Sequence, residues 1–294
     1  MKDVVALVKH EGDLSVSSRS KTLKKAIGLI GGFGSLKSPF IIKPNIVTHP
    51  SKDVTGFACT KIDMVEALLR LVLQEQKGLS IKIVESNSES KYADEETFEG
   101  YGYKDLEERL KKESFDISLV NISEPPLSKI NFDGLYFKEL ELHKLLTESN
   151  YFASVAVAKT HSLTNVTGVI KNLFGLLPRK NKSFYHSQIN EVIIDLNRFV
   201  KPDLCIVDAI VGMEGVLRGK TRRVNALIVG KKPVSVDATM ARIMGFKPEI
   251  IRHLVIGEKH GLGTLHPKVV GDSIDSLTVK FKSPTNLRPT ALID

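Results

Sequence analysis

The sequence predicts an α/β fold, with a mostly parallel or mixed sheet flanked by helices. Two observations predict this class. Short apolar runs alternate with helix-like stretches along the chain, as in βαβ units, and the clearest helical stretch is apolar on one face only. The length of 294 residues favours two lobes, because a domain usually holds about 100 to 200 residues. We place an N-terminal α/β lobe at 1–125 and a C-terminal α/β lobe at 126–294; one single domain is the alternative.

The first part of the chain predicts three strands separated by two helices. The strands are expected at 4–9, 39–43 and 80–85, and the helices at 21–29 and 61–76. In the second helix the apolar residues recur at spacings of three and four: Ile62, Val65, Leu68, Leu69 and Val72. Gly78 follows this helix and ends it, as a glycine after a helix often does.

A polar, acidic stretch at 86–99 predicts a long surface loop, either a lid or a solvated excursion. A helix at 104–111 and a strand at 117–121 follow. The Asp133-Gly134 pair between alternating segments indicates a hairpin, so we expect an antiparallel pair to interrupt the parallel pattern.

The second part begins with a small apolar stretch at 151–158, which predicts a buried strand leading to Lys159-Thr160-His161. Loops at strand ends are where open α/β sheets usually hold ligands. The later elements are expected as a helix at 187–199, strands at 204–208 and 226–230, helices at 235–244 and 248–260, and a final strand at 276–281.

Composition narrows the function class. Hydrophobic residues make up 42% and charged residues 26%, which excludes wholesale disorder and a collagen-like chain. No apolar run approaches the roughly 18 residues of a membrane span, and the first residues lack a signal peptide's apolar core. We therefore expect a cytoplasmic protein with no membrane partner. Cys59 and Cys205 are too few for an iron–sulfur cluster, and the net charge of +8 indicates anionic partners.

The stretch 149–190 contains no aspartate or glutamate, whereas random placement would put about five there. Its basic residues are Lys159, Lys171, Arg179, Lys180 and Lys182, with His161 and His186 beside them. A basic solvated face is the plain interpretation; the alternative is a site for a negative ligand. Lys159 and Lys171 lie among apolar residues, where an unpaired charge is costly, so we expect these two to meet a ligand or a partner. We expect the three basic residues at 179–182 to be solvated.

Two further groups are candidates for chemistry. Lys43 and Asn45 flank a proline at a strand end, where they can face a ligand or simply form a turn. Asp208 and Glu214 lie six positions apart beside glycines, a pattern that suits a possible divalent metal, acid–base work or hydroxyl binding; a capped turn with an exposed glutamate is the alternative. We expect Asp237 to be an early-turn acidic residue of a helix.

Short polar motifs run through most of the chain: Lys43-Pro44-Asn45, Glu85-Ser86, Lys159-Thr160-His161, Thr167-Gly168-Val169-Ile170-Lys171-Asn172-Leu173-Phe174-Gly175, Tyr185-His186, Val207-Asp208-Ala209, Met213-Glu214-Gly215 and Val236-Asp237-Ala238. Together they resemble the family called domain of unknown function 362. The resemblance implies that the matched polar positions gather at one site. Many members carry an added ferredoxin-like segment with iron–sulfur clusters, for which this chain has no cysteine run. The layout is also similar to that of the nickel-cofactor lactate racemases, although no motif of that class is present.

Our leading functional hypothesis is an enzyme that binds a small anionic substrate, a phosphate or a carboxylate. Lys43, Asn45, Thr160, Lys171 and Asn172 are the substrate-binding candidates. Lys159, His161 and His186 are the catalytic candidates, because a histidine with a pKa of about 6.5 suits proton transfer near neutral pH. Asp208 and Glu214 are the possible metal ligands. The alternative is a nucleic-acid-binding or regulatory module that uses the basic segment 159–186 to follow a phosphate backbone.

Overall fold

The structure is a computed structural model that describes residues 3–148, 150–217 and 219–284. Its strands are β1 (Val4–Lys9), β2 (Phe40–Pro44), β3 (Ile81–Glu85), β4 (Ile117–Asn121), β5 (Leu127–Asn131), β6 (Glu139–His143), β7 (Tyr151–His161), β8 (Asn165–Thr167), β9 (Leu204–Met213), β10 (Thr221–Gly230) and β11 (Lys268–Gly271). Its α-helices are α1 (Val16–Leu29), α2 (Ile62–Glu75), α3 (Glu95–Gly100), α4 (Tyr103–Lys112), α5 (Val169–Asn172), α6 (Ile189–Val200), α7 (Pro233–Ile243), α8 (Arg252–Lys259) and α9 (Ile274–Leu277).

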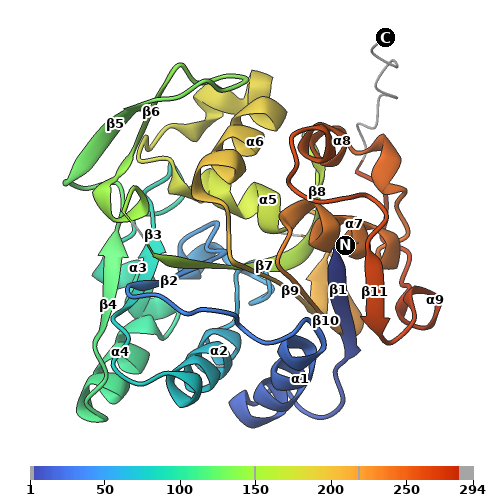
Figure 1. Ribbon diagram of the computed structural model, residues 1–294, viewed down its shortest axis with the longest axis horizontal. Coiled ribbons are helices and arrows are strands. Elements are labelled where there is room, and N and C mark those ends of the chain that lie inside the picture. Colours follow the sequence, from blue (N-terminus) through green and yellow to red (C-terminus); the bar gives the residue numbers. More distant parts are fainter. Residues whose placement is uncertain (1–2, 149, 218, 285–294) are drawn as a thin grey trace.

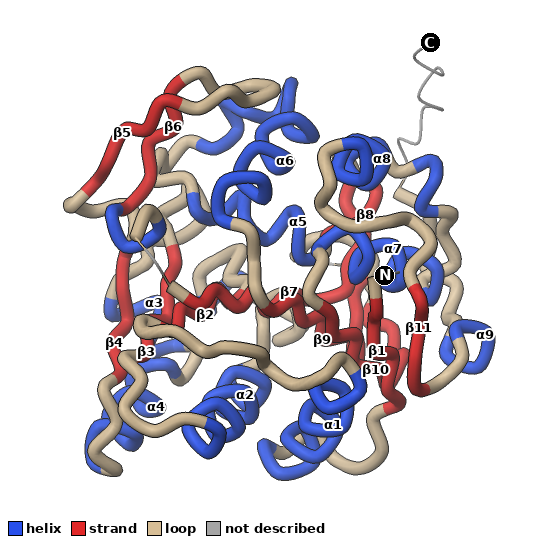
Figure 2. The backbone as a smooth tube through the Cα atoms, in the orientation of Figure 1, coloured by secondary structure: helices blue, strands red, loops and turns tan. Residues whose placement is uncertain are grey.

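One twisted sheet crosses the molecule (Figure 2) in the order β11-β1-β10-β9-β7-β2-β3-β4, and β8 pairs with β7. The pairs β7–β2, β2–β3, β3–β4, β7–β9 and β1–β11 are parallel. β10 is antiparallel to both of its neighbours, so along this path it alone runs against the others. The predicted α/β class with a mixed, mostly parallel sheet is therefore confirmed.

Helices cover both faces of the sheet. α1, α2 and α4 lie together below it in Figure 1, and α5 to α8 lie above it. The apolar side chains divide in the same way into two cores: one packs α1, α2 and α4 against the sheet, and the other packs α5 to α8 against the opposite face. Alternating residues of the central strands point to opposite faces, as strand geometry requires. The parallel strands are consequently buried on both sides, which explains their continuous apolar runs.

Most predicted elements are present, and several are longer than expected. The strands predicted at 4–9 and 117–121 have the observed bounds. β7 continues past residue 158 to include Lys159-Thr160-His161, and β9 continues past residue 208 to Met213. In β7 the added residues Lys159 and Thr160 are polar but buried, so an apolar pattern alone underestimates the length of the strand. In β9 the buried Asp208 interrupts an apolar run that continues to Met213.

Two expectations need correction. Residues 276–281 do not form a strand: 276 and 277 belong to α9, and the chain beyond runs along the end of α7, where Val279 donates a backbone hydrogen bond to Ile243. The edge strand is instead β11, which pairs with β1. The hairpin at the Asp133-Gly134 turn is present as β5–β6, but it forms a separate two-stranded sheet and does not interrupt the main one.

The division expected at residue 125 does not separate two sheets. β2, β3 and β4 come from the first part of the chain, and β7, β9, β10 and β11 come from the second. β1 belongs to the first part but lies between β10 and β11 of the second. Both parts therefore build a single sheet.

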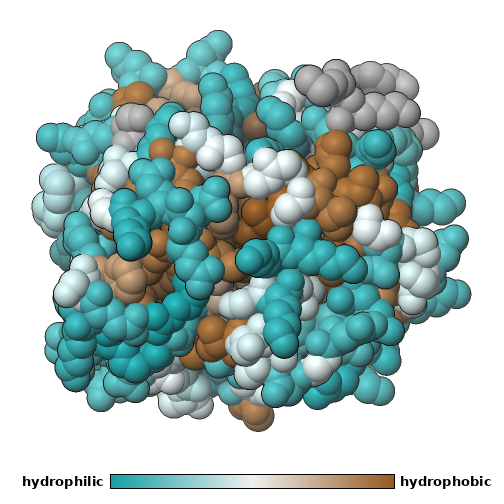
Figure 3. Space-filling model, turned by 60° about the horizontal axis from the view of Figure 1, so that its bottom comes forward, coloured by the Kyte–Doolittle hydropathy of each residue, from teal (hydrophilic) through white to brown (hydrophobic). Residues whose placement is uncertain are grey.

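Among the described residues, none of the helices combines the length and the apolar character that crossing a bilayer requires. On the face shown in Figure 3, most residues are hydrophilic, and hydrophobic residues gather in a band across its middle.

The order of the strands creates a switch point between β2 and β7. From β2 the chain proceeds outward to β3 and β4, then returns to the other side of β2 as β7. The connections on the two sides of this point leave the sheet in opposite directions, which opens a crevice at the carboxyl ends of the strands. This edge is where the polar motifs of β2, β3 and β7 end.

One buried ion pair links α1 to the sheet. Arg19 Nη1 lies 2.6 Å from Asp208 Oδ2, and the two side chains are only 2% and 6% exposed. Because removing one partner leaves a buried charge unpaired, we expect Asp208→Ala to lower the free energy of unfolding by about 3–5 kcal/mol. Urea denaturation checks this value.

The exposed pair Lys9–Glu11, with side chains 53% and 78% exposed, provides the matched control for Asp208→Ala. We expect Glu11→Ala to change stability by less than about 1 kcal/mol, because water screens an exposed pair. A loss of the same small size in both variants would contradict the structural role of the Arg19–Asp208 pair.

Candidate functional site

A cavity of ≈ 210 Å³ opens at the carboxyl edge of the sheet, beside the switch point. We call it the carboxyl-edge cavity. Its polar lining combines four lysines, one carboxylate, two amides and three hydroxyls: Lys43, Lys91, Lys171, Lys182, Glu85, Asn45, Asn172, Ser86, Ser88 and Ser90. The lysines outnumber the glutamate, so the lining favours a negative ligand.

Glu85 is the buried carboxylate at the centre of this lining. Its Oε2 accepts hydrogen bonds from Lys43 Nζ at 2.7 Å and from the Ile46 amide at 3.2 Å. Its Oε1 accepts from the Ser86 amide at 2.9 Å and lies 3.4 Å from Lys91 Nζ. Burial by itself raises the pKa of Glu85, but Lys43 and Lys91 together hold the pKa below its usual value. Glu85 is therefore an anion that balances part of the lysine charge.

Lys182 corrects our expectation that the three basic residues at 179–182 are solvated. Arg179 and Lys180 are exposed, but Lys182 is buried and its Nζ donates to the backbone oxygens of Asn87 and Arg179. Burial lowers the pKa of Lys182 to about 7, against the opposing effect of Glu85. The stretch 86–99 is not the plain surface loop that we expected. Its first residues line the cavity, and its last residues belong to α3.

In the Thr167–Gly175 motif, a buried acidic side chain holds the short helix that carries the lysine. Asp237 Oδ1 accepts from the Val169 amide at 2.8 Å, and its Oδ2 accepts from the Ile170 amide at 2.9 Å. Asp237 is the fifth residue of α7 and fully buried, so it does not serve the first turn of its own helix as we expected; it holds the start of α5. Burial raises the pKa of Asp237 to about 7. A Cβ on Gly168 would overlap this carboxylate, so the motif requires glycine there.

Asn172 joins the two strands of the switch point. Its Nδ2 donates to the Lys43 backbone oxygen of β2 and to Ser154 Oγ of β7, both at 3.0 Å. Gly175 then passes close to the same lysine, since a Cβ there would lie 2.9 Å from Lys43 Cε. The Gly175 oxygen accepts from Ser86 Oγ at 2.7 Å. The motif is thus tied to β2, β3 and β7 at once.

Lys171 is partly exposed and lines the cavity. Its Nζ lies 5.5 Å from the centre of the Phe174 ring. In the described residues no carboxylate lies within ion-pair distance of it. Burial, reinforced by the positive charge of Lys159, lowers the pKa of Lys171 to about 8. Lys171 is therefore the lysine of this cavity that is best placed to meet an incoming anion.

The two histidines differ in what they can do. His161 Nδ1 accepts from the Leu163 amide at 3.1 Å, and burial, with Lys171 nearby, lowers its pKa to about 2. His186 is exposed and stacks on Phe174, with ring centres 6.1 Å apart. Burial of part of the ring and the charge of Lys171 also lower the pKa of His186. Both imidazoles are consequently neutral near pH 7, and the more accessible one is His186.

Three other predicted residues have local partners. Lys159 is fully buried, and its Nζ donates to the Ala58 oxygen at 2.6 Å; burial lowers its pKa to about 8. Thr160 Oγ1 accepts from the Gly215 amide at 2.7 Å. Neither residue lines the carboxyl-edge cavity. Asn45 does line it, and its Nδ2 donates to Ala58 at 3.1 Å.

The structure does not bring Asp208 and Glu214 together. Asp208 pairs with Arg19, whereas Glu214 Oε1 lies 2.6 Å from Arg222 Nε and accepts from the Lys282 amide at 2.8 Å. Within the part of the chain that the structure describes, no three His, Cys, Asp or Glu side chains are arranged to hold a metal ion.

The sequence analysis placed Glu85 at the site only through the family resemblance and gave it no function there, and it misjudged Lys182 and Asp237. Glu85 and Ser86 end a predicted strand, so their place at the carboxyl edge could have been inferred from the parallel pattern. The contact between Asp237 and α5 joins segments 68 positions apart, and no local pattern reports such a contact.

These features define an α/β protein with a lysine-rich cavity at the switch point of its sheet. Among solved structures, the fold is similar to that of the lactate racemase apoprotein from Thermoanaerobacterium thermosaccharolyticum, with a TM-score of 0.50 and 11% identity. The match covers 83% of this chain but only 57% of the racemase chain, and at this identity it shows the fold alone.

Residues 41–242 match the family model described as domain of unknown function (DUF362), and the chain belongs to this family. It is also 26% identical, over 259 residues, to a thylakoid-associated protein of Synechocystis sp.. That match covers 84% of this chain and 76% of the relative. The matched family region contains the whole carboxyl-edge cavity.

Gly168→Ala tests the close approach of Asp237 to α5. We expect it to lower the free energy of unfolding by about 1–3 kcal/mol, because the added methyl group forces the Asp237 carboxylate away from the two amides. Chemical denaturation measures the loss.

Gly28→Ala is the control for Gly168→Ala, since a Cβ at that position in α1 meets nothing within 4 Å. We expect it to change stability by less than about 1 kcal/mol, or to increase it, because alanine favours a helix. Equal stability of the two variants would show that α5 does not depend on this contact.

Proposed function

We propose that this protein is an enzyme that binds a small anionic substrate, a phosphate or a carboxylate, in the carboxyl-edge cavity. One observation carries the proposal. Lys171 lines a cavity at the switch point of the sheet, and among the described residues no carboxylate lies within ion-pair distance of its ammonium group. A partly buried ammonium without a counter-ion is costly, and an anionic ligand supplies the missing charge.

The size and lining of the cavity limit the substrate. Its ≈ 210 Å³ is below the roughly 300–1,000 Å³ of typical drug-sized ligand sites, so a small metabolite fits better than a dinucleotide. The hydroxyls of Ser86 and Ser90 already donate to the backbone oxygens of Gly175 and Val47, so the donors for a carboxylate or a phosphate are the lysine ammonium groups. Glu85 is already bonded to Lys43 and Lys91, which leaves Lys171 for the ligand.

We assign proton transfer to His186 in preference to His161. A proton acceptor must be neutral and within reach of the ligand. His186 stacks on Phe174, which lines the cavity, and Lys171 lowers the pKa of the imidazole. His161 is half-buried, and its Nδ1 is occupied by the Leu163 amide. Asp208 and Glu214 are neutralised by arginines, so the proposal gives them no metal.

Burial of the basic segment favours a small anion over a nucleic acid. A module that follows a phosphate backbone presents its lysines at the surface, where they replace counter-ions. Here Lys159 and Lys182 are buried and Lys171 is only partly exposed.

Lys171→Met tests the proposal. Acetate, lactate, malonate and inorganic phosphate are the probes, and isothermal titration calorimetry ranks their binding to the wild type. We expect Lys171→Met to weaken the tightest probe at least about tenfold, since a charge-assisted hydrogen bond is lost. The melting temperature should change by less than about 2 °C, because no ion pair of the fold is broken.

Lys180→Met is the matched control, since Lys180 lies in the same segment but is exposed and does not line the cavity. It should bind the same probe as the wild type does. Unchanged affinity in Lys171→Met, or a loss of stability with no loss of affinity, would refute the assigned role.

The pH dependence gives an independent check. The pKa of Lys182 is lowered to about 7 and that of Lys171 to about 8. Because these groups lose their positive charge as the pH rises, we expect the affinity for lactate to be highest below pH 7. It should fall through pH 7–9, by up to about tenfold per pH unit for each proton. Lactate stays ionised throughout this range, so a flat profile from pH 6 to pH 9 would contradict a lysine-dependent site.

A further inference from the structure

A second cavity, of ≈ 580 Å³, lies at the opposite edge of the sheet. It is formed by the end of α6, the turn after β10 and the turn after α8, and we call it the amino-edge pocket. β10 ends here beside the first residues of β1 and β9, since Gly230 pairs with Val5 and Cys205. The pocket is therefore separated by the length of the strands from the carboxyl-edge cavity.

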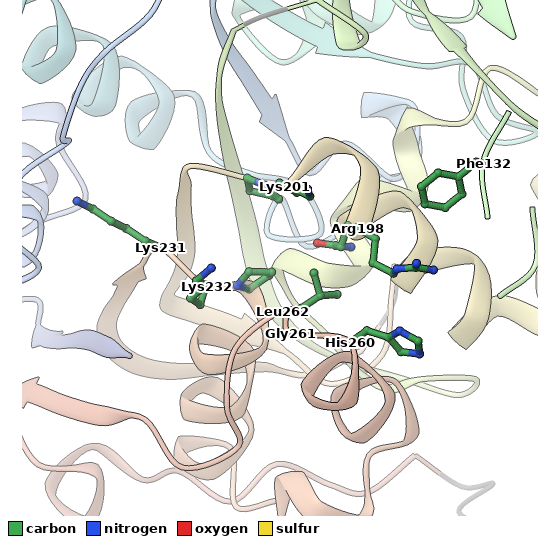
Figure 4. Close-up of a pocket in the computed structure, with 11 residues that line it drawn as sticks. Phe132, Arg198, Lys201, Lys231, Lys232, His260, Gly261 and Leu262 are labelled. Atoms are coloured by element: carbon green, nitrogen blue, oxygen red, sulfur yellow. The ribbon is translucent and has the colours of Figure 1, made fainter. Parts of the chain in front are cut away.

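The amino-edge pocket is basic. Lys201, Lys232, Arg198 and His260 surround its opening, whereas Lys231 extends away from it (Figure 4). None of the described residues that line it is an aspartate or a glutamate. Arg198 is partly engaged, with its Nη1 3.3 Å from a carboxylate oxygen of Asp195. The two lysines at the opening are exposed and supply net positive charge from two different elements.

A buried hydrogen-bond acceptor in the pocket indicates that the ligand also carries a hydrogen-bond donor. Asn197 lines the pocket and is 0% exposed. Its Nδ2 donates to Ile170 at 2.9 Å and to Ile193 at 2.7 Å, which fixes the amide orientation. Its Oδ1 has no hydrogen-bond partner in the described structure. A buried acceptor of this kind is normally satisfied, and a hydroxyl group is a suitable donor.

α7 begins at the same place. Its N-cap residue is Lys232, which provides no side-chain cap. Pro233 has no N–H group and the Val234 amide already donates to the Leu262 oxygen, so the start of α7 attracts an anion through the partial positive charge of the helix dipole. The helix therefore adds to the field of the two lysines, and Asn197 lies beside it.

We propose that the amino-edge pocket binds a hydroxylated organic phosphate. Its phosphate group lies between Lys201, Lys232 and the start of α7, and a hydroxyl donates to Asn197 Oδ1. The volume of ≈ 580 Å³ is within the range of small-molecule sites, so the pocket has room for a sugar together with its phosphate. This site is independent of the substrate site that we propose at the carboxyl edge.

Calorimetry with ribose 5-phosphate, AMP, ribose and inorganic phosphate tests the proposal on the full chain. We expect at least one of the two organic phosphates to bind more tightly than ribose or inorganic phosphate alone. The double variant Lys201→Ala/Lys232→Ala should weaken that binding at least about tenfold, because two charge-assisted contacts are removed from exposed positions. If neither organic phosphate binds more tightly than inorganic phosphate in Lys171→Met, where the anion contact at the carboxyl edge is removed, the role of Asn197 is overturned.

Two control variants distinguish binding in this pocket from binding elsewhere on the protein. Lys24→Ala/Lys25→Ala removes two exposed lysines of α1 and should leave the affinity unchanged; an equal loss in this variant would show a non-specific charge effect and refute the site. Lys171→Met should also leave the affinity for the organic phosphate unchanged, because Lys171 lies in the other cavity. Loss of binding in Lys171→Met alone would move the ligand to the carboxyl edge.

Discussion

A single buried carboxylate, Glu85, governs the arrangement of the carboxyl edge. The end of β2 and the loop after β3 each bring a lysine to it, and two backbone amides complete its hydrogen bonds. Without Glu85, Lys43 and Lys91 would be buried cations with no counter-ion, a state that proteins avoid. The chain can therefore close tightly around β2 and β3, and Gly175 can pass against Lys43.

A second buried carboxylate, that of Asp237, fixes the position of Lys171 in the cavity. Asp237 holds the first amides of α5, and this short helix presents Lys171 to the cavity while Asn172 bonds to β2 and β7. A helix of one turn has little stability of its own, so its geometry comes from these contacts. Glu85 comes from the first part of the chain and Asp237 from the last, and the site needs both.

The fold class and most elements could be predicted from local pattern. The apolar period of α2 and the apolar runs of β1, β4 and β7 mark where these elements lie, because burial of one or both faces dictates residue type. The exceptions have physical causes. The four residues of β11 are at most half-buried at the sheet edge and carry little pattern, while 276–281 has an apolar alternation that packs against α7 without pairing.

The sequence by itself determined that the chain is an α/β protein with an acid-free, lysine-rich segment, and it singled out Lys171 and Asn172 as candidates for a site. Composition and residue spacing contain this information because secondary structure and local charge depend on residues that are close together in the sequence. Only the tertiary structure decided which partner each buried lysine has: Lys43 bonds to Glu85, and Lys159 bonds to the carbonyl of Ala58. It also gave Asp208 and Glu214 separate arginine partners. Charge compensation depends on distance in space, and residues far apart along the chain supply it.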